Sequence, residues 1–182
     1  MSTCTGKCAP GYYCSGGTIT PTPTGTAGTI CAIGTYCPEG SVEETKCPAG
    51  KYNPNTGQKD CLACPAGFYC VEGESEPKAC KKGHYCEGNT STENGEPCAE
   101  GKYQDETNHW KCLECLPGYA CETRGMTGLT NSELCAKGYY CKYGSKTKQP
   151  VGLTEGDRCA KGFYCNEGSS FQTPCPPGLA CP

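Results

Sequence analysis

The sequence predicts a small, disulfide-rich fold in which tandem cysteine-rich repeats form an elongated rod, mostly irregular with short β-hairpins. Three observations lead to this fold class. Cysteine fills 21 of the 182 positions, and a share of roughly 12% is typical of disulfide scaffolds. Leu, Ile, Val and Phe together number only 16, too few to build a hydrophobic core for a chain of this length. A motif of cysteine and glycine recurs ten times, as in repeat proteins.

The cysteine content also predicts the compartment. Disulfides stabilise a fold by restricting the unfolded chain, each by about 2–4 kcal/mol. They persist only in oxidising surroundings. We therefore expect the protein at an extracellular or cell-surface location.

Charge and hydropathy argue against several partners. The net charge is −3 with acidic and basic residues interspersed, so no basic patch is present that could bind nucleic acid. No stretch approaches the roughly 20 apolar residues of a membrane helix, and we expect no membrane insertion. Residues 1–4 lack the apolar segment of a secretory signal, which leads us to expect an incomplete or processed chain.

The repeated motif is a cysteine, two residues, a glycine, one residue and usually a tyrosine. Its opening cysteines are Cys8, Cys31, Cys47, Cys64, Cys80, Cys98, Cys115, Cys135, Cys159 and Cys175. Glycine is present in all ten copies and tyrosine in eight, with Ala120 and Ala180 as the exceptions. We expect the glycine at a turn or a close backbone approach. We expect the tyrosines to cover neighbouring disulfides as small cores; the alternative is a ladder of aromatic rings for stacking on sugars or bases.

The copies come in two lengths, and their order predicts larger units. Five residues separate the two cysteines in eight copies, whereas thirteen separate Cys47 from Cys61 and Cys98 from Cys112. These long copies are related by a constant shift of 51 residues. We predict the end of a preceding repeat at 1–17, a Thr/Pro-rich spacer at 18–30, and super-repeats at 31–79, 80–134 and, divergent, 135–182. Each unit would be of EGF-like size, and no segment has the periodicity of a helix.

Cys4 leaves an odd cysteine at the start of the chain. Cys4 and Cys8 are spaced much as Cys61 and Cys64 are, so Cys4 looks like the closing cysteine of a long repeat. We expect it to be unpaired within these residues and to bond a preceding segment or another protomer.

The segment from Cys47 to Cys70 carries a family resemblance. It reads CPAGKYNPNTGQKDCLACPAGFYC, and this pattern resembles the ephrin-receptor-like cysteine-rich repeats and, more distantly, the modules of tumour necrosis factor receptors. Similar runs occur in large secreted surface proteins of algae, ciliates and other protists, including flagellar-hair (mastigoneme-type) proteins. The resemblance covers nearly the whole chain from Cys4 onward and indicates a repeat class rather than one function.

The resemblance implies two disulfides. In the receptor-type modules the cysteines of the long gap close their own loop, which implies the bonds Cys47–Cys61 and Cys98–Cys112. For the short repeats, a bond from Cys64 to Cys70 and a bond from Cys70 onward to Cys80 both stay open, since spacing does not fix connectivity.

Two kinds of glycosylation are expected. The segment Thr18–Thr29 alternates threonine with proline or glycine, which favours extended chain and O-linked sugar; a plain flexible spacer is the alternative. The candidate acceptors are Thr18, Thr20, Thr22, Thr24, Thr26 and Thr29. Asn89-Thr90-Ser91 is a sequon for N-linked sugar in a polar run, where Asn89 should be exposed.

Catalytic, metal and cofactor sites are not predicted. The CxxC pairs Cys61–Cys64 and Cys112–Cys115 have the spacing of half a zinc site, yet they fall at a fixed place in the repeat, and neither histidine, His84 nor His109, recurs with them. No nucleophile or carboxylate pair is placed by a recognisable scaffold. Trp110 is expected to pack partly buried, with an interface anchor as its alternative role.

These expectations favour a structural role over an enzyme. The first reading is a repeat segment of a secreted glycoprotein that forms an extracellular fibre, surface coat or flagellar hair, with copies of itself or adjoining segments of the same large chain as partners. The second is the stalk of a ligand-binding or adhesion receptor ectodomain. Exposed apolar residues gathered in one repeat would favour the receptor, whereas contacts that recur along the chain would favour the polymer.

Overall fold

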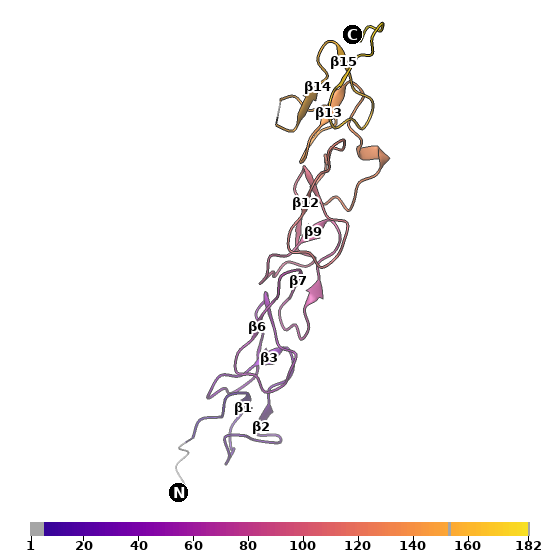
Figure 1. The fold of residues 1–182 in the computed structure, drawn as a ribbon. Helices are drawn as coiled ribbons and strands as arrows, with labels where there is room; N and C mark the ends of the chain where they lie inside the picture. Colours follow the sequence, from indigo (N-terminus) through magenta and orange to yellow (C-terminus); the bar gives the residue numbers. More distant parts are fainter. Residues whose placement is uncertain (1–5, 153, 182) are drawn as a thin grey trace. The chain divides into compact units, whose positions relative to one another are not determined.

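The structure is a computed structural model of the chain, and it describes residues 6–152 and 154–181. Cys4 lies outside the described residues. The chain forms two compact units, the first made of residues 1–80 and 86–95 and the second of 81–85 and 96–182. Short strands joined by loops and turns build both units (Figure 1).

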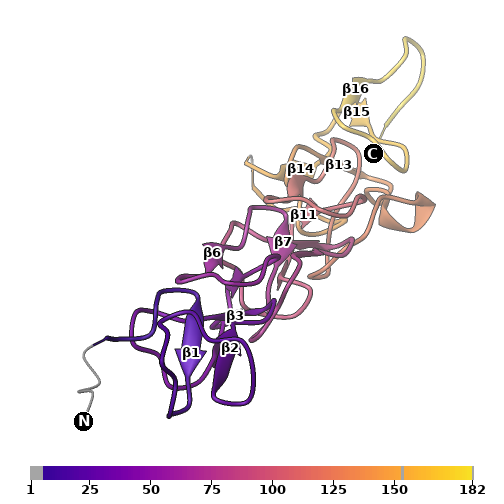
Figure 2. The same ribbon diagram turned by 90° about the horizontal axis from the view of Figure 1, so that it is seen from below.

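The first compact unit contains four two-stranded antiparallel hairpins. β1 (Tyr12–Cys14) pairs with β2 (Gly28–Ile30), β3 (Thr35–Tyr36) with β4 (Thr45–Lys46), β5 (Lys51–Tyr52) with β6 (Leu62–Ala63), and β7 (Phe68–Tyr69) with β8 (Lys78–Ala79). Figure 2 shows the same strands from below.

The second compact unit contains four more hairpins and one turn of 3₁₀-helix. β9 (His84–Tyr85) pairs with β10 (Glu96–Pro97), β11 (Lys102–Tyr103) with β12 (Leu113–Glu114), β13 (Tyr139–Cys141) with β14 (Gly156–Arg158), and β15 (Phe163–Tyr164) with β16 (Thr173–Pro174). The 3₁₀ turn η1 spans Asn131–Glu133. No α-helix occurs among the described residues.

Each hairpin corresponds to one copy of the sequence motif. Its first strand follows the motif glycine, and its second strand ends at the residue before the next opening cysteine. The glycine supplies the turn that starts the hairpin: Tyr12 donates its N–H to the carbonyl of Ala9 at 3.0 Å, and Gly11 has a φ of 85°. A left-handed third residue is what a type II turn requires, and glycine adopts it without strain. The predicted hairpins are confirmed.

Tyrosines and disulfides make the small cores, as the sequence predicts. Tyr69 packs on Cys80 and Cys86, and Tyr103 packs on Cys115 and Cys121. In both cases the ring covers the disulfide of the repeat that follows. These tyrosines are only 8% and 7% exposed, so they are core residues rather than exposed stacking platforms.

The Cys115 repeat shows why one copy lacks tyrosine. Ala120 is fully buried there and donates its N–H to the carbonyl of Glu133 in η1. Tyr119 forms an isolated bridge with Leu134 in place of a regular hairpin. Ala120 packs on the disulfide of the following repeat, Cys135–Cys141, with Tyr139 beside it, and so takes the place that a tyrosine ring holds in other repeats.

Two hairpins in different compact units are built alike and longer than the others. β1–β2 and β13–β14 each have three residue pairs, and both first strands read YYC. In each, the residue after the opening cysteine donates its N–H to the far loop: Ala9 to Pro21 at 2.8 Å, and Ala136 to Lys148 at 2.9 Å. The Thr/Pro-rich segment is therefore the loop of a hairpin tied back to its own repeat.

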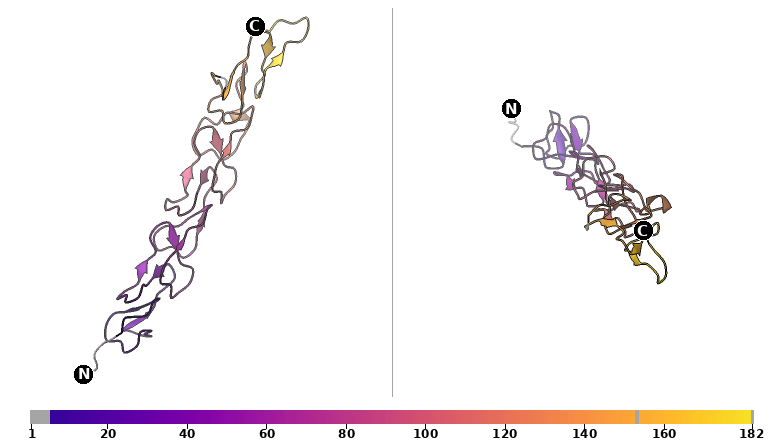
Figure 3. Two further views of the ribbon diagram at one scale, coloured as in Figure 1. Left: turned by 60° about the vertical axis from the view of Figure 1, so that its left-hand side comes forward. Right: turned by 90° about the horizontal axis from the view of Figure 1, so that it is seen from above.

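The fold class is the predicted one, a small disulfide-rich repeat fold. Ten disulfides join the described cysteines, and in each compact unit the chain passes through its repeats in sequence order (Figure 3). Within the described residues, no helix has the length and apolar character needed to cross a bilayer. The super-repeat boundaries and the rod remain predictions.

Candidate functional site: the stacking contact and the glycan acceptors

The feature that organises the repeats is a close backbone contact at the motif glycine. Gly11 donates its N–H to the carbonyl of Cys37 at 2.8 Å and accepts from the N–H of Cys31 at 3.0 Å, so both of its main-chain groups bond the next repeat. The carbonyl of Gly57, which belongs to the repeat after that, lies where a side chain on Gly11 would begin. Three successive repeats therefore meet at one glycine. We call this arrangement the stacking contact.

The stacking contact recurs in both compact units. In every case a carbonyl from a left-handed residue two repeats onward covers a motif glycine. The pairs are Gly11–Gly57, Gly34–Gly73 and Gly50–Asn89 in the first unit, and Gly83–Gly125, Gly101–Gly144 and Gly118–Gly168 in the second. The covering residue also donates its N–H to the opening cysteine of the intermediate repeat, as Gly57 does to Cys31 at 2.8 Å. The same side-chain-free geometry thus occurs three times in each unit.

Two buried amides take the place of a cysteine in the long repeats. The seventh position of the motif is cysteine in short repeats but Asn53 and Gln104 in the long ones, and their carbonyls accept the N–H of Gly34 and Gly83 as a cysteine carbonyl does elsewhere. Asn53 is fully buried and Gln104 is 1% exposed. Our sequence analysis missed both residues, although an alignment of long repeats on short ones would have revealed them.

Hydrogen bonds hold these amides where short repeats have a disulfide. Asn53 Nδ2 donates to the carbonyls of Thr35 at 2.8 Å and Asp60 at 3.2 Å, while Oδ1 has no protein partner. Gln104 Nε2 donates to the carbonyl of Lys111 at 2.9 Å, and Oε1 accepts from the N–H of Glu106 at 3.1 Å. Because buried amide groups need partners, each amide fixes the long loop of its own repeat.

All twenty described cysteines are paired within their own repeats. The structure bonds Cys47 to Cys61 and Cys98 to Cys112, the two bonds that the resemblance implies. The remaining eight bonds close the short gaps, and they are Cys8–Cys14, Cys31–Cys37, Cys64–Cys70, Cys80–Cys86, Cys115–Cys121, Cys135–Cys141, Cys159–Cys165 and Cys175–Cys181. Of the two open alternatives for Cys70, the structure thus has Cys64.

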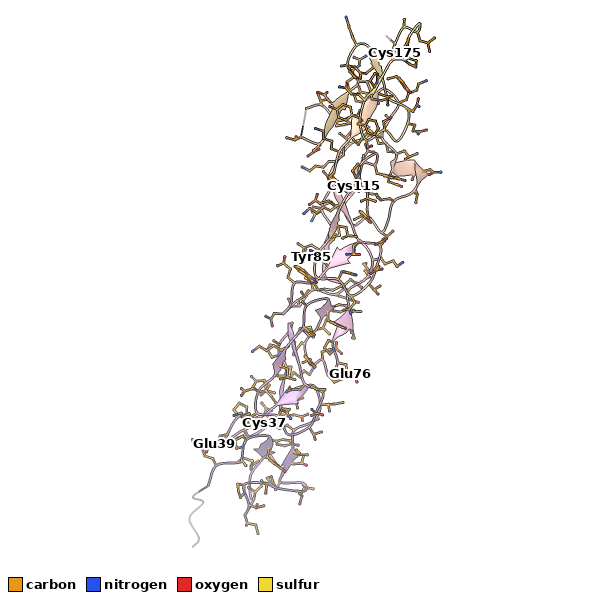
Figure 4. The ribbon with its side chains drawn as sticks, in the orientation of Figure 1. Cys37, Glu39, Glu76, Tyr85, Cys115 and Cys175 are labelled. Atoms are coloured by element: carbon orange, nitrogen blue, oxygen red, sulfur yellow. A yellow bond between two sulfur atoms is a disulfide. The ribbon has the colours of Figure 1, made fainter. Side chains whose placement is uncertain are left out.

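Most disulfides have at least one cysteine buried inside its unit, whereas many acidic side chains lie at the surface. Figure 4 labels Cys37 and Cys115, which are fully buried, and Glu39 and Glu76, which are exposed. Ten of the twenty described cysteines are 0% exposed. A reductant can therefore reach most of these disulfides only after the surrounding structure opens locally.

Asn89 occupies a place in the stacking contact that glycine holds in other repeats. Its φ is 51°, its N–H donates to the carbonyl of Cys64 at 2.8 Å, and its carbonyl lies over Gly50. Asparagine tolerates this left-handed conformation better than other residues with a side chain. The residue is exposed. A sugar on Asn89 would therefore start from a backbone that is fixed on both sides.

The six threonines of the Thr/Pro-rich loop differ in exposure. Thr20, Thr22, Thr24 and Thr26 are exposed, whereas Thr18 is half-buried and Thr29 is half-buried within β2. Pro23 is buried and packs against Gly28. The geometry thus leaves the four exposed threonines as the more accessible acceptors.

Ionisable groups are dispersed, and the shifted ones are structural. Burial and the nearby Asp105 raise the pKa of Tyr103. Hydrogen bonds from Thr130 and Ser132 lower the pKa of Glu133, whose carboxylate caps η1. Hydrogen bonding and charge attraction from Glu74 raise the pKa of Lys78.

The two histidines lie apart from the cysteines that the CxxC spacing offers. His84 Nδ1 contacts the carbonyl of Lys82, and His109 Nε2 contacts the carboxylate of Glu106 at 2.9 Å. In the part of the chain that the structure describes, no three metal-ligating side chains gather.

Trp110 corrects one expectation. The side chain is 55% exposed rather than partly buried, and the Lys111 ammonium lies 4.8 Å from its ring centroid. A cation over the ring face is an attractive contact, yet it leaves most of the indole in solvent because the long loop of the Cys98 repeat is anchored through Gln104 instead.

Comparison with known families identifies the repeat type. Residues 34–80 match the family described as tyrosine-protein kinase ephrin type A/B receptor-like. Residues 34–80 therefore have the sequence of ephrin-receptor-like cysteine-rich repeats. The matched segment contains the long Cys47 repeat and the short Cys64 repeat, on which the sequence resemblance was based. No curated protein matches the chain. Ephrin-receptor-like repeats with many disulfides are of the extracellular type and typically non-catalytic.

Proposed function

We propose that the chain is a structural repeat segment of a secreted glycoprotein that forms an extracellular fibre, surface coat or flagellar hair. The observation that carries this proposal is the stacking contact, which at three motif glycines in each compact unit links a repeat to the next two through backbone groups. Such a contact resists bending and extension because a repeat that makes it is held by both of the repeats that follow, and the disulfides keep each repeat closed.

The distribution of exposed apolar side chains also supports a structural role. Large exposed apolar residues are spread over many repeats, and they are Ile19, Ile30, Ile33, Val42, Leu62, Trp110, Leu113, Leu116, Tyr143, Val151, Tyr164, Phe171 and Leu179. Leu62 and Leu113 are even equivalent, 51 residues apart, at 50% and 40% exposure. Recurrence of this kind favours contacts repeated along a polymer over a single ligand face.

A receptor or adhesion stalk is the second candidate, and Trp110 favours it. An exposed tryptophan beside a lysine is a common anchor at protein interfaces, and Lys59 stands at the equivalent place in the Cys47 repeat. In that reading the Cys98 repeat binds a protein ligand and the other repeats act as a spacer.

Electron microscopy of the protein isolated from its native source without reductant separates the two candidates. A structural segment should appear as regular filaments with a repeating protomer, and these should disappear after reduction. Isolated flexible rods that never assemble would contradict the structural role and favour the receptor stalk.

Peptide mass spectrometry of the same material tests the glycoprotein. We expect N-linked sugar on Asn89 and O-linked hexose or hexosamine on the exposed threonines of the loop. Peptides that carry neither modification would show that the protein is not a glycoprotein at these positions. The structural role would still be tested by electron microscopy.

A further inference from the structure

The two disulfides of the long repeats are fully buried on one side only. Cys47 and Cys98 are 0% exposed, whereas their partners Cys61 and Cys112 are half-buried. The residues on both sides of each partner are exposed, namely Asp60 and Leu62 in the first repeat and Lys111 and Leu113 in the second. A thiol in solution can therefore approach each of these disulfides from its closing cysteine but not from its opening cysteine.

The closing cysteines of the long repeats also lie outside the stacking contact. In six short repeats the carbonyl of the closing cysteine accepts the N–H of the preceding motif glycine, as Cys70 accepts that of Gly50 at 2.8 Å. In the long repeats the buried amide residue makes this bond instead. In the described part of the chain, no backbone hydrogen bond joins Cys61 or Cys112 to another repeat. A change of bonding partner at either sulfur thus leaves the stacking contact in place.

The buried amides hold the closing end of each long loop without a covalent bond. Asn53 Nδ2 donates to the carbonyl of Asp60 at 3.2 Å and lies 3.6 Å from Sγ of Cys61. Gln104 Nε2 donates to the carbonyl of Lys111 at 2.9 Å. Asp60 and Lys111 directly precede the closing cysteines, and β6 and β12 begin directly after them. The backbone of each closing cysteine is thus held on both sides, so the loop keeps its place when the disulfide opens.

Exposure alone does not distinguish these two disulfides from the others. Cys14 and Cys159 are also half-buried. The N–H of each bonds another repeat, however, at 2.9 Å from the carbonyls of Ser41 and Gly138 respectively. A new bond at either sulfur would therefore disturb contacts between repeats. The closing cysteines of the long repeats are accessible and have all their backbone anchors within their own repeat.

We propose that Cys61 and Cys112 are thiol-exchange sites, at which an external thiol forms a mixed disulfide while the repeats stay stacked. The thiolate of the incoming molecule attacks Sγ of Cys61 and forms a new S–S bond. The bond from Cys61 to Cys47 breaks, and the Cys47 sulfur leaves with the electron pair and takes up a proton from water. One disulfide is lost and one is formed, so no oxidant or reductant is consumed. Cys98 is the leaving sulfur at the second site.

The chemistry of the site accepts any sulfur nucleophile, whether a small thiol or a cysteine of another chain. With a cysteine of another chain, the exchange links the two chains covalently through a long repeat. The released Cys47 thiol stays beside Cys61 and expels the incoming group when the exchange runs in reverse, so the link is reversible. The inference goes beyond the proposed structural function, and it applies equally to a fibre segment and to a receptor stalk.

Reduced glutathione is the probe for the two sites. The oxidised chain carries Cys4→Ser, so that this thiol does not compete, and is incubated with glutathione in native buffer at mildly alkaline pH. N-ethylmaleimide then blocks the released thiols, and peptide mass spectrometry locates both groups. We expect glutathione on Cys61 and Cys112 and N-ethylmaleimide on Cys47 and Cys98. These adducts should form at least roughly tenfold faster than any at the bonds Cys64–Cys70 and Cys115–Cys121, whose cysteines are all buried.

A second arm of the experiment distinguishes the two sources of thiol. It replaces glutathione by a small folded protein with one exposed cysteine. Adducts with both probes would show that the sites accept a thiol of another chain, whereas adducts with glutathione alone would assign the sites to small thiols.

Hydrogen exchange of the glutathione adduct tests whether the repeats stay stacked. The N–H of Gly57 donates to the carbonyl of Cys31 at 2.8 Å, and we expect its protection to stay within about threefold of the unmodified chain. Asn53→Ala should remove this protection in the Cys61 adduct, because the loop then has neither its disulfide nor its amide anchor. The Cys98 repeat of the same variant, with Gln104 intact, is the matched control and should stay protected.

Three outcomes would overturn the thiol-exchange sites. The first is glutathione on Cys64 or Cys70 as early as on Cys61. The second is an adduct in which the N–H of Gly57 has lost its protection, since exchange would then require the repeats to separate. The third is an Asn53→Ala adduct as well protected as the parent adduct, since the amide would then not hold the loop.

Discussion

The Nδ2 atom of Asn53 donates a hydrogen bond to the main-chain carbonyl of Thr35, 2.8 Å away, from the motif position that is cysteine in short repeats. The backbone there is the same in both kinds of repeat, because the carbonyl of Asn53 accepts the N–H of Gly34 as the carbonyl of Cys37 accepts that of Gly11. A long repeat is therefore a short one in which an amide replaces a sulfur and the closing cysteine moves outward.

Removing this amide should weaken the Cys47 repeat. We predict that Asn53→Ala lowers the local free energy of opening by about 1–3 kcal/mol, since it leaves the carbonyls of Thr35 and Asp60 buried without a donor. Hydrogen exchange of the amides within residues 47–61 measures this change. Asn55→Ala is the control, because Asn55 is exposed in the same loop. Equal protection in the two variants would show that the Asn53 amide contributes little.

Moving the cysteine should convert the long repeat to the short form. We predict that Asn53→Cys combined with Cys61→Ser forms a Cys47 disulfide at position 53, since the backbone already has the short-repeat geometry at that place. Peptide mapping without reduction identifies the bond. A free thiol at position 53 in folded protein would contradict the equivalence of the two positions.

The stacking contact predicts different costs for one substitution at two motif glycines. Gly50→Ala and Gly138→Ala both force a left-handed alanine, which costs about 1–2 kcal/mol. At Gly50 the new Cβ would also lie 2.5 Å from the carbonyl oxygen of Asn89, whereas nothing lies within 4 Å at Gly138. We expect a further loss of roughly 1–3 kcal/mol at Gly50 from this overlap.

Hydrogen exchange at the N–H of the next opening cysteine measures how much each substitution destabilises the local structure. Cys64 donates to Gly50 and Cys159 donates to Gly138, at 2.9 Å in both cases. Similar losses of protection at the two cysteines would mean that the covering carbonyl does not constrain the glycine.

Tyr103 predicts how the second compact unit responds to alkaline pH. Burial and Asp105 raise the pKa of its phenol above the ordinary value of 10.0, so the folded unit favours the neutral ring. Its contribution is complete below pH 10 and is lost as pH rises through the folded pKa. We expect the denaturation midpoint of the unit to fall above pH 10, and to fall less in Tyr103→Phe.

The matched control for this pH dependence is Tyr143→Phe. Tyr143 is 65% exposed, so its removal should leave the alkaline slope unchanged. A Cys4→Ser background and short incubations limit thiolate exchange in these measurements. A slope that is the same in all three proteins would show that Tyr103 ionises equally in the folded and unfolded states.

Local features were predictable from the sequence and distant contacts were not. The glycine turn and the tyrosine that covers a disulfide follow from residue types at fixed spacing, so Gly11 and Tyr69 could be interpreted directly. The similarity of the β1–β2 and β13–β14 hairpins was not predicted from the sequence, because their loops share almost no residues. Its trace is the YYC sequence and a shift of 128 residues that relates Cys31, Cys37 and Cys47 to Cys159, Cys165 and Cys175.

The stacking contact itself was beyond the sequence. It joins a repeat to the repeat two places later in the chain. The contact is made by a backbone carbonyl, which every residue type has, so no residue pattern predicts it directly. The only sequence sign of the contact is a glycine that recurs three or four residues after the seventh motif position. Asn89 departs from this pattern, although it keeps the left-handed φ. The glycan acceptors could be listed from the sequence, but their exposure required the folded loops.

Disulfide mapping of the unreduced protein tests the central claim most directly. The account predicts that proteolysis followed by mass spectrometry will find every bond of residues 8–181 inside one repeat, with Cys64 joined to Cys70 and Cys80 joined to Cys86. Successive repeats would then be held to one another by the stacking contact and by tyrosine packing, with no disulfide between them. A bond between Cys70 and Cys80 would contradict the account, because covalent links rather than the stacking contact would connect successive repeats.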